Sequence, residues 1–456
     1  MIMKKTFKLL KLTLAFATIS FIGKAQNPII QGKFTGDPAP VVFKDTLFLY
    51  VGHDEDSSPS NSFLMREYSL FTTTDMVNWT AHKTPLKTSD FKWSAGDASA
   101  AQCIERNGKY YWYMSSINKT SPGVSIGVAV SNSPYGPFKD AIGKALVTNN
   151  MTTFGKHSWD DLDPTVMIDD NGQAYLYWGN NACYWVKLNK DMVSLGSPIT
   201  ALDIFDKSAF GPDFEEAPWV YKKKDLYYMA YASNVVESIH YSTSKSPEGP
   251  WKYGGLLMAP TGKSNTNHPG IIDYKGNSYF FYHNGALPGG GSFKRSVCVE
   301  QFTYNPDGSI PEMKMTDGIV KSVGKLNPFK RTEAETMAWS QGIKLDENNQ
   351  VGVYVTDINN DDYIKVRDVD FGSLGVSKFE ANVSSRFFGG KIEIHLDSNS
   401  GELIGTLNVP YIGDWDEWKL LSTDVKTVTG THDLYFVFKG KTPQVLFNFD
   451  YWKFNK

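Results

Sequence analysis

The segments NGKYYWYMSS at residues 107–116 and NGQAYLYWGN at residues 171–180 indicate how this chain folds. Each starts at a turn that contains glycine and continues with alternating aromatic and aliphatic residues, which is the period-two pattern of a β-strand. The same combination of turn and strand occurs again as DTLFLY at 45–50, KKDLYYMAYAS at 223–233 and KGNSYFFYHNG at 275–285. Because successive turns are roughly 50–65 residues apart, the first two-thirds of the chain is a structural repeat.

A second apolar strand precedes each of these turns. The five preceding segments are PVVF at 40–43, AQCIE at 101–105, TVMID at 165–169, PWVYK at 218–222 and GIIDY at 270–274. Two more strand-length segments separate successive copies, so each repeat supplies about four strands, which is the content of one propeller blade. Helical periodicity is weak throughout residues 27–325. We therefore predict a five-bladed β-propeller over residues 26–326.

The residues after the repeat show a different all-β pattern. A short linker is expected at residues 327–331, and short alternating strands such as THDLYFVFKG at 431–440 follow it. Strands of this kind, separated by turn residues, are typical of an antiparallel β-sandwich. The sequence thus predicts an all-β protein in which a β-sandwich of the jelly-roll type at residues 332–456 follows the propeller.

The first 25 residues predict a signal peptide. Lys4 and Lys5 begin a positive segment, an apolar run covers residues 12–22, and the small residues Gly23 and Ala25 precede the expected cleavage position. No later stretch approaches the roughly 20 apolar residues that a transmembrane helix needs. We expect cleavage near Ala25 and an exported protein, periplasmic or extracellular, with no membrane partner.

The composition narrows the function classes. The 456 residues include 46 Lys and Arg against 49 Asp and Glu, a net charge of −3, so the chain lacks the basic surface of a nucleic-acid-binding protein. Its three cysteines, Cys103, Cys183 and Cys298, are odd in number, far apart and placed in apolar strands. They predict buried free thiols rather than a disulfide framework or a metal site.

Ionisable residues recur at one position of the repeat. Asp37, Ser99, Asp163 and Glu216 each lie nine residues before the turn position, and His268 lies eight residues before it. Equivalent positions of the blades lie at equal distances from the propeller axis, so these side chains should converge at one end of the central channel. Clustered carboxylates repel one another, and their convergence therefore points to chemistry rather than to stability.

Carboxylates that converge in this way suit the hydrolysis of a glycosidic bond. One protonated acid gives its proton to the leaving oxygen, while an ionised one deprotonates water or attacks carbon. A third carboxylate raises the pKa of the acid by charge repulsion. The alternative is a site for a hard cation such as Ca²⁺ made by the same acids and His268. Zn²⁺ is less suited, because no second His or Cys falls in register.

Four segments of the repeat resemble glycoside hydrolase family 43. They are GDPAPVVF at 36–43, DLDPTVMIDDNGQAYLYWGN at 161–180, FEEAPWVYKKKDLYYMAYAS at 214–233 and NHPGIIDYKGNSYFFYHNG at 267–285. The resemblance implies a five-bladed propeller and an inverting hydrolase of pentose-rich plant polysaccharides. By this resemblance Asp37 is the general base, Glu216 the general acid and Asp163 the residue that tunes and orients the acid. Glu215 is the rival acid, but the family's acid precedes a small residue and proline, as Glu216 does.

The resemblance also implies roles for surrounding residues. His268 corresponds to an axial histidine that is often associated with Ca²⁺ or a water cluster, and Arg295 to an arginine that reaches the substrate pocket. His53 falls in a loop that lines the pocket, with a structural role at the surface as the alternative. Ser99 stands where the family commonly has a tryptophan that shapes the sugar subsites. We expect this change to affect which sugar fits and to leave the acid and the base in place.

Residues 332–456 resemble a family 6 carbohydrate-binding module. The most specific parts are the opening EAE at 333–335 and the closing FNFDYWKF at 447–454. The resemblance implies a structural Ca²⁺ held by Glu333, Glu335 and Asp450, and solvated acids are the alternative.

The same resemblance implies a sugar site formed by Tyr354, Trp415 and Asn448 at the loop end of the sandwich. Aromatic faces stack on sugar rings, because the C–H groups of the ring present an apolar patch to the π cloud. Trp418 is expected to belong to the core, since it lies in a strand rather than in the turn.

Together these inferences favour an exported, inverting glycoside hydrolase that removes α-L-arabinofuranosyl units from arabinoxylan or arabinan. A β-xylosidase acting on xylan or xylo-oligosaccharides is the alternative, since both sugars present similar geometry at the reacting carbon. A non-catalytic carbohydrate-binding protein is the alternative from another class, and the complete set of acids argues against it. The expected partner is a plant cell-wall polysaccharide. The expected cofactor is Ca²⁺ in the module, possible also near His268, and the chemistry itself needs none.

Overall fold

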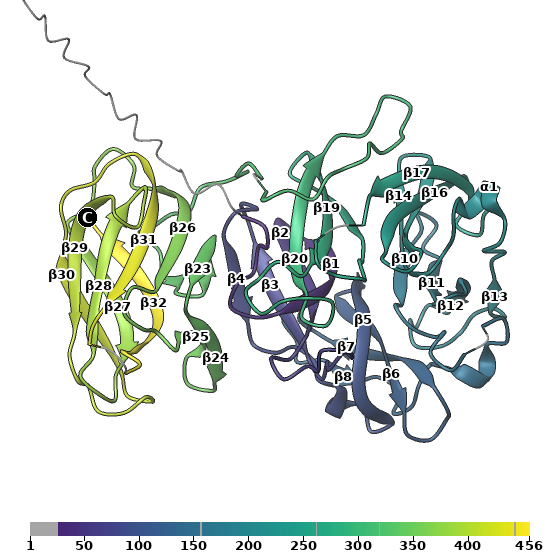
Figure 1. The fold of residues 1–456 in the computed structure, drawn as a ribbon, viewed down its shortest axis with the longest axis horizontal. Helices are drawn as coiled ribbons and strands as arrows, with labels where there is room; N and C mark the ends of the chain where they lie inside the picture. The colour runs from purple at the N-terminus through teal and green to yellow at the C-terminus, as the bar shows by residue number, and fades with distance from the viewer. Residues whose placement is uncertain (1–25, 156, 261, 319, 442–443) are drawn as a thin grey trace, which may run out of the picture.

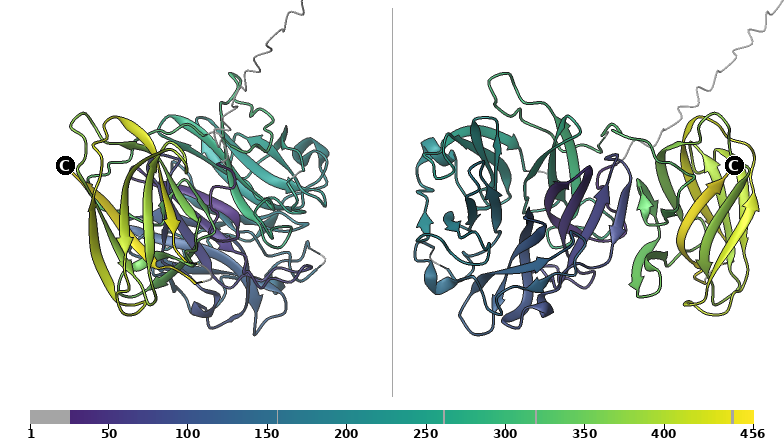
Figure 2. Two further views of the ribbon diagram at one scale, coloured as in Figure 1. Left: turned by 60° about the vertical axis from the view of Figure 1, so that its left-hand side comes forward. Right: turned by 180° about the vertical axis from the view of Figure 1, so that it is seen from behind.

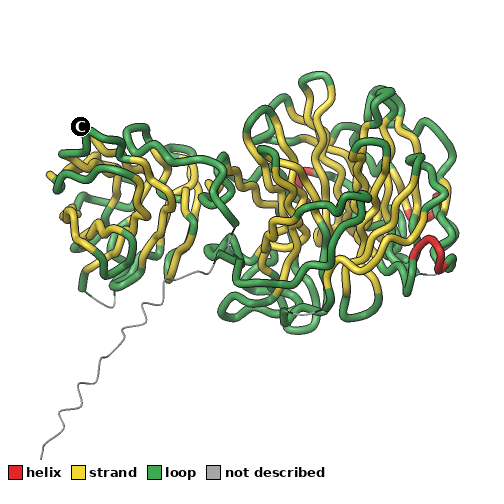
Figure 3. Tube along the Cα trace, turned by 90° about the horizontal axis from the view of Figure 1, so that it is seen from above, coloured by secondary structure: helices red, strands yellow, loops and turns green. Residues whose placement is uncertain are grey.

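The computed structural model describes residues 26–155, 157–260, 262–318, 320–441 and 444–456, which form two bodies built of β-strands (Figure 1). Five sheets within the first 302 residues form the blades of a propeller, and the later strands form a sandwich of two sheets beside it. Strands and loops make up almost all of both bodies (Figure 3). The predicted all-β class and both architectures are confirmed. The predicted signal peptide lies outside the described residues.

The propeller has one antiparallel sheet per blade. Blade 1 contains β1 (Thr35–Phe43), β2 (Thr46–His53), β3 (Tyr68–Thr73) and β4 (Trp79–His82). Blade 2 contains β5 (Ser94–Arg106), β6 (Lys109–Asn118), β7 (Val124–Ser131), β8 (Lys139–Asp140) and β9 (Val147–Thr148). Blade 3 contains β10 (Thr165–Ile168), β11 (Ala174–Trp178), β12 (Tyr184–Leu188) and β13 (Thr200–Ala201).

Blade 4 contains β14 (Glu216–Lys223), β15 (Leu226–Ser233), β16 (Ser238–Ser244) and β17 (Lys252–Met258). Blade 5 contains β18 (Gly270–Tyr274), β19 (Asn277–Asn284) and β20 (Ser296–Phe302). The short helix α1 (Lys207–Phe210) and the 3₁₀ turns Thr88–Asp90 and Asn149–Met151 lie in connections between strands.

The sequence repeat corresponds to the hairpin between the first two strands of each blade. In blade 2, Arg106 pairs with Lys109 across a turn in which Asn107 and Gly108 have φ of 55° and 76°. A two-residue turn of this kind needs left-handed backbone, which Asn-Gly adopts at little cost. Residues of the returning strand then enter the core, where Trp112 is fully buried.

The sandwich consists of two facing sheets. One contains, in spatial order, β24 (Lys344–Asn348), β25 (Gly352–Thr356), β32 (Asn448–Asn455), β27 (Lys378–Ser384) and β30 (Trp418–Asp424), and β21 (Thr332–Glu333) also pairs with β32. The other contains β23 (Trp339–Gln341), β26 (Tyr363–Asp370), β31 (Thr431–Lys439), β28 (Gly390–Leu396) and β29 (Glu402–Val409). Apolar residues from both sheets, among them Phe436 and Trp452, form its core.

The sandwich lies beside blade 1 (Figure 2) and is joined to it by backbone pairing as well as by side chains. The strand β22 (Thr336–Met337) runs antiparallel to β4 and extends blade 1 to five strands. Asn78 donates a hydrogen bond to the backbone oxygen of Arg367 at 2.9 Å and accepts one from its backbone nitrogen at 2.8 Å. Residues 327–331 therefore lie between two folds, and β22, which follows them, adds a fifth strand to the edge of blade 1.

The three cysteines are buried free thiols, as the sequence predicted. Each lies in or beside an aromatic-rich strand of the propeller and packs there as a small apolar side chain. Among the residues that the structure describes, no helix has the length and apolar character needed to cross a membrane.

Candidate active site

Three acidic residues near the starts of blades 1, 3 and 4 are held by unusual backbone. Asp37 has a φ of 54°, Asp163 has a φ of 57°, and Ala217, directly after Glu216, has a φ of 58°. The strand pairing also shifts register within β1 and β14 at these places. Bulges re-aim side chains and are common beside active sites. In this chain the unusual backbone at these positions directs the three carboxylates toward one cavity.

The three carboxylates line one cavity of about 290 Å³. Ser99 lines the same cavity from blade 2. His268 approaches from blade 5, and its Nδ1 lies 3.9 Å from a carboxylate oxygen of Asp37 and 3.9 Å from one of Asp163. The five repeat positions therefore converge, as their common register predicted.

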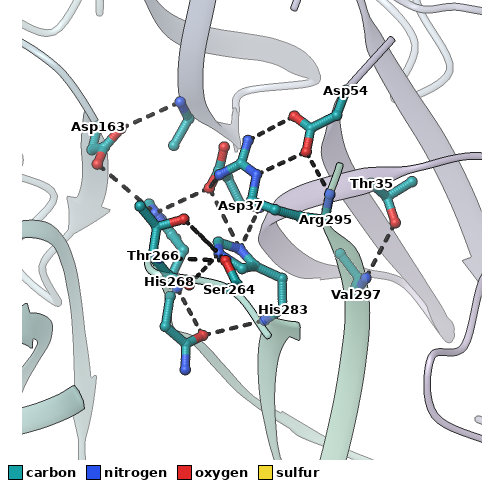
Figure 4. Close-up of polar contacts among 12 residues, drawn as sticks. Thr35, Asp37, Asp54, Asp163, Ser264, Thr266, His268, His283, Arg295 and Val297 are labelled. Atoms are coloured by element: carbon teal, nitrogen blue, oxygen red, sulfur yellow. Dashed lines mark hydrogen bonds and ion pairs between the residues drawn. The ribbon is translucent and has the colours of Figure 1, made fainter. Parts of the chain in front are cut away.

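Asp37 is buried and paired with the guanidinium of Arg295 (Figure 4). Nη1 of Arg295 donates to Oδ1 of Asp37 at 2.5 Å, while Nε and Nη2 donate to the fully buried Asp54 at 2.8 and 2.9 Å. Short hydrogen bonds between a guanidinium and carboxylates fix the orientation of both partners. Arg295 lines the cavity as expected, and its contacts show that it also orients Asp37.

Two buried histidines support the acids. The backbone N–H of Asp37 donates to Nδ1 of His283 at 3.2 Å, and Nε2 of His283 lies 3.0 Å from the backbone oxygen of Thr266. A ring that accepts at one nitrogen and donates at the other is neutral. Burial lowers the pKa of His283 well below its usual value and lowers the pKa of His268 to about 4. His283 therefore holds the backbone of Asp37, His268 lies beside both acids, and neither ring adds positive charge.

Glu216 has the properties of a proton donor. The side-chain amide of Asn180 donates to its Oε2 at 2.5 Å. Desolvation raises the pKa of Glu216, the hydrogen bond from Asn180 lowers it, and the negative charge of Asp37 raises it, so that the pKa is about 7. Burial, followed by repulsion from Glu216 and Asp37, also raises the pKa of Asp163 well above its usual value. The cavity thus contains one carboxylate paired with Arg295 and two carboxyl groups, those of Glu216 and Asp163, whose pKa values are raised.

Glu215 and His53 do not line this cavity. Glu215 accepts a hydrogen bond from the side chain of Asn181 at 3.0 Å, and the bulge presents its neighbour Glu216 to the cavity. Nδ1 of His53 lies 3.0 Å from Oε1 of Glu67, and the ring lines a separate hollow shared with the sandwich. The expected position of His53 in the substrate pocket is wrong, because Glu67 holds the ring on the side that faces the module.

An exposed indole forms part of the cavity wall. Trp159, in a loop before blade 3, is 54% exposed and lines the cavity together with Phe63. Ser99 occupies the position where a tryptophan is expected from the family resemblance, and Trp159 supplies an aromatic face from another blade. Trp159 could not be predicted from the repeat, because it lies outside the repeated strands.

The residues expected to bind sugar in the sandwich belong to two aromatic pairs. Tyr354 packs edge-on against Trp418 with ring centroids 5.3 Å apart, and Trp415 packs edge-on against Phe387 at 5.7 Å. Asn448 is 3% exposed, and its amide is hydrogen-bonded to neighbouring hydroxyl groups. Trp418 begins β30 and is only partly buried, so its expected place in the core is wrong.

The acids expected to bind Ca²⁺ in the module lie close to one another. Glu335 and Asp450 are 4% and 1% exposed, and each has one buried carboxylate oxygen without a hydrogen-bond partner. Arg331 pairs with Glu333 at 2.8 Å and lies 3.5 Å from Asp450. Burial, with repulsion from the other two acids, raises the pKa of Glu335 well above its usual value. Unpaired carboxylate oxygens are the ligands that Ca²⁺ prefers, so the donor chemistry fits.

No three His, Cys, Asp or Glu side chains of the described residues already stand in an arrangement that could hold a metal ion. The carboxylates of Glu333, Glu335 and Asp450 would therefore have to move closer to one another to coordinate a cation. Nδ1 of His268 lies 3.9 Å from a carboxylate oxygen of Asp37 and 3.9 Å from one of Asp163. The carboxylate of Asp37 is already paired with Arg295. Arg295 therefore already provides a positive charge beside Asp37.

Both bodies of the chain match known families. Residues 25–310 match the glycosyl hydrolases family 43, and residues 333–456 match the carbohydrate binding module (family 6). An arabinoxylan arabinofuranohydrolase of Bacillus subtilis (strain 168) is 32% identical over 94% of this chain and 92% of its own length. A xylosidase/arabinosidase of Bacteroides ovatus is 29% identical over 62% of this chain and 95% of its own length.

The similarity extends to three dimensions. The crystal structure of a family 43 arabinoxylan arabinofuranohydrolase from Bacillus subtilis, in complex with cellotetraose, matches with 32% identity and a TM-score of 0.82. The match covers 95% of this chain and 99% of that chain, so it includes both the propeller and the sandwich. The chain is a glycoside hydrolase that belongs to family 43, and its propeller is followed by a family 6 carbohydrate-binding module.

Proposed function

We propose that this chain is an exported, inverting α-L-arabinofuranosidase that removes arabinofuranosyl units from arabinoxylan or arabinan. The observation that carries the proposal is the contrast between two carboxyl groups in one cavity: Asp37 is paired with a buried arginine, and Glu216 is partly buried, with its pKa raised to about 7 by desolvation. Similarity over nearly the full length to arabinoxylan arabinofuranohydrolases supports the choice of sugar.

In the proposed mechanism Glu216 gives its proton to the glycosidic oxygen as the bond to the arabinofuranosyl carbon breaks. Asp37 takes a proton from the water molecule that attacks the same carbon from the opposite face, which inverts its configuration. Arg295 holds Asp37 in place for this step. Asp163 interacts electrostatically with both groups, and we assign it the role of tuning the acid.

Release of sugar from three substrates tests this proposal. Arabinose should be released from arabinoxylan and from an aryl α-L-arabinofuranoside, with little xylose from an aryl β-D-xyloside. Preferential release of xylose would contradict the proposal. It would support a β-xylosidase, the second candidate, which is favoured by the similarity to the xylosidase/arabinosidase of Bacteroides ovatus.

Activity on arabinoxylan should fall as the pH rises through about 7. Glu216 acts as an acid only while it is protonated, and burial raises its pKa to about 7. The protonated fraction is therefore high below this pH and decreases about tenfold for each unit above it. The pH dependence of kcat/KM measures this alkaline limb. A limb near the ordinary glutamate pKa of about 4.3 would contradict the assignment.

We propose that the module binds the polysaccharide through Tyr354, Trp415 and Asn448. Trp415→Ala should weaken binding to insoluble xylan by about 1–3 kcal/mol, by analogy with base stacking on protein aromatics. Turnover of a small aryl glycoside should barely change, since that substrate needs only the propeller cavity. Pull-down on insoluble xylan beside a chromogenic assay measures both. Unchanged binding of Trp415→Ala, with weakened binding of Trp418→Ala, would show that the Tyr354–Trp418 pair forms the platform instead.

We propose that Glu333, Glu335 and Asp450 hold a structural Ca²⁺ that neutralises their repulsion and ties β21 to β32. Millimolar CaCl₂ should raise the Tm of the chelated protein, because a ligand that binds only the folded state stabilises it. Glu335→Gln removes one buried charge and should reduce this Ca²⁺-dependent increase. A scanning calorimetry series with Ca²⁺ and with Mg²⁺ measures the effect. An equal Tm with and without Ca²⁺ would contradict the site.

A further inference from the structure

A groove lies between the propeller and the module. Its largest part is a cavity of about 690 Å³, compared with about 290 Å³ for the active-site cavity. The propeller contributes residues 31–34, Asp56, 287–289 and Lys294, and the module contributes residues 339–344. These module residues run from β23 to the start of β24, on the side of the module that faces the propeller (Figure 1). Neither body forms this cavity alone.

The groove continues into a second cavity of about 430 Å³. The two cavities share the lining residues Gly32, Lys33, Asp56 and Lys344. They are therefore adjoining parts of one depression, which we call the interdomain groove. A depression that extends over two adjoining cavities suits an extended chain better than a single small molecule, which one concave pocket would enclose.

The side chains that line the interdomain groove are of the kinds that bind sugars. The indole of Trp339 is partly exposed, and Phe34, Leu287 and Pro288 add apolar surface. Aromatic faces stack on the C–H faces of sugar rings. The side-chain amide of Gln341 is both a donor and an acceptor, which matches the hydroxyl groups of a sugar.

The charges in the interdomain groove favour a neutral ligand. Lysines and acidic residues line it in equal number, namely Lys33, Lys294 and Lys344 against Glu55, Asp56 and Glu67. Nζ of Lys344 lies 3.4 Å from Oδ2 of Asp56. Nζ of Lys33 lies 3.8 Å from Oε1 of Glu67. A polyanion would be repelled by these acids, whereas the hydroxyl groups of a neutral chain can bond to residues of either charge.

The interdomain groove adjoins the active-site cavity along the chain. Phe34 lines the groove and Asp37 lines the active-site cavity, and three residues of chain span at most about 10 Å. Lys294 and Arg295 are direct neighbours, of which the first lines the groove and the second the active-site cavity. A ligand that extends a short distance out of the active-site cavity therefore reaches the groove.

Aromatic rings lie between the two sites. The ring of Phe63, in the wall of the active-site cavity, lies 4.6 Å from the guanidinium carbon of Arg295 and packs edge-on against Phe293 at 4.8 Å. Phe293 belongs to the loop between β19 and β20, whose residues 287–289 and Lys294 line the groove. Because Phe63 is 37% exposed, a chain that leaves the cavity here meets an aromatic surface on its way to the groove.

We propose that the interdomain groove binds the main chain of the polysaccharide whose branch occupies the active-site cavity, and that this main chain is xylan. The inference rests on the proposed function and narrows its substrate from arabinoxylan or arabinan to arabinoxylan. The pyranose rings of xylan present flat C–H faces to Trp339 and Phe34, and the xylan chain carries no charge. The groove therefore adds affinity only for a substrate long enough to extend out of the active-site cavity.

Two variants test the groove by opposite changes. Trp339→Ala removes a stacking surface, and Pro288→Trp fills the groove from an exposed position in the loop. Each should raise KM on soluble arabinoxylan about tenfold with kcat unchanged, by analogy with the loss of one stacked base. KM on the aryl arabinofuranoside should stay at the parent value, because this substrate does not reach the groove. Leu374→Ala and Pro306→Trp, at exposed positions outside the groove lining, are the matched controls.

Calorimetry gives a readout without turnover. The double variant Glu216→Ala, Trp415→Ala lacks the proposed acid and the proposed stacking residue of the module, and it should still bind xylohexaose. Adding Trp339→Ala or Pro288→Trp should weaken this binding about tenfold. Xylohexaose carries no arabinose, so this result does not depend on which sugar the active site removes.

The other outcomes overturn the proposal. An unchanged KM on arabinoxylan in both groove variants would do so, and so would an equal rise of KM on the aryl arabinofuranoside, which would indicate a disturbed active-site cavity. Tighter binding of polygalacturonate than of xylohexaose would contradict a neutral ligand. If the parent releases no arabinose from arabinoxylan, the proposed function fails, whereas binding of xylohexaose that depends on Trp339 and Pro288 would still support the xylan site.

Discussion

Glu216→Ala should lose about 10²–10⁴-fold in kcat on arabinoxylan, the contribution typical of a positioned general acid. The leaving group of a natural glycoside is an alkoxide, which needs a proton as the bond breaks. An aryl arabinofuranoside with a good leaving group needs much less protonation, so the same variant should retain most of its activity on it. We would measure kcat of the variant and of the parent on both substrates. A much larger loss on arabinoxylan than on the aryl arabinofuranoside identifies Glu216 as the general acid.

Glu215→Gln is the matched control for this variant. Glu215 is adjacent in sequence but does not line the cavity, where the bulge in β14 presents Glu216. We expect Glu215→Gln to keep the parent's ratio of kcat on arabinoxylan to kcat on the aryl arabinofuranoside. Equal losses of Glu216→Ala on both substrates would indicate a structural role for Glu216, and a leaving-group-dependent loss in Glu215→Gln would reassign the acid.

Asp37→Asn should lower kcat by about 10²–10⁴-fold on every substrate, whatever its leaving group. The amide has nearly the shape of the carboxylate but cannot take a proton from the attacking water. Because water attack is required for natural and aryl substrates alike, the ratio of the two activities should stay near that of the parent. The two catalytic variants are thus distinguished by this ratio and not only by the size of the loss.

Asp54→Asn is the control for Asp37→Asn. Both carboxylates bind the guanidinium of Arg295, but only Asp37 lines the cavity. Thermal unfolding should report the cost of weakening the ion pair in both variants, whereas kcat should fall much further in Asp37→Asn. Losses of equal size in the two variants would indicate that the disturbed arginine, and not a missing base, explains the effect.

Most of the fold could be predicted from the sequence because the blades repeat. The turn and the alternating strand recur with a fixed spacing, and a common register then places Asp37, Asp163 and Glu216 together. One contact between the two bodies could not be predicted: β22 lies within the residues that match the module, yet it pairs with β4 of blade 1. A two-residue strand has no pattern of its own, and its partner depends on how the two bodies meet.

The supporting residues of the site could not be predicted in the same way. Asp54 and His283 act through contacts between distant parts of the chain, with Arg295 and with the backbone of Asp37. Trp159 lies in an irregular loop, whose path has no periodicity. The expected position of His53 is wrong because the sequence shows which loop contains this residue but not that Glu67 binds its ring. Repetition thus predicts where the acids converge, whereas the residues that orient them depend on tertiary contacts.

The stereochemistry of hydrolysis tests the central claim most directly. Proton NMR can follow the first arabinose that the enzyme releases from arabinoxylan, before the free sugar mutarotates. Water activated by Asp37 opposite a proton-donating Glu216 should give β-L-arabinofuranose first, since inversion converts the α-linkage into the β-anomer. Initial appearance of the α-anomer would show retention and make Asp37 a nucleophile rather than a base, and release of xylose in place of arabinose would contradict the proposed substrate.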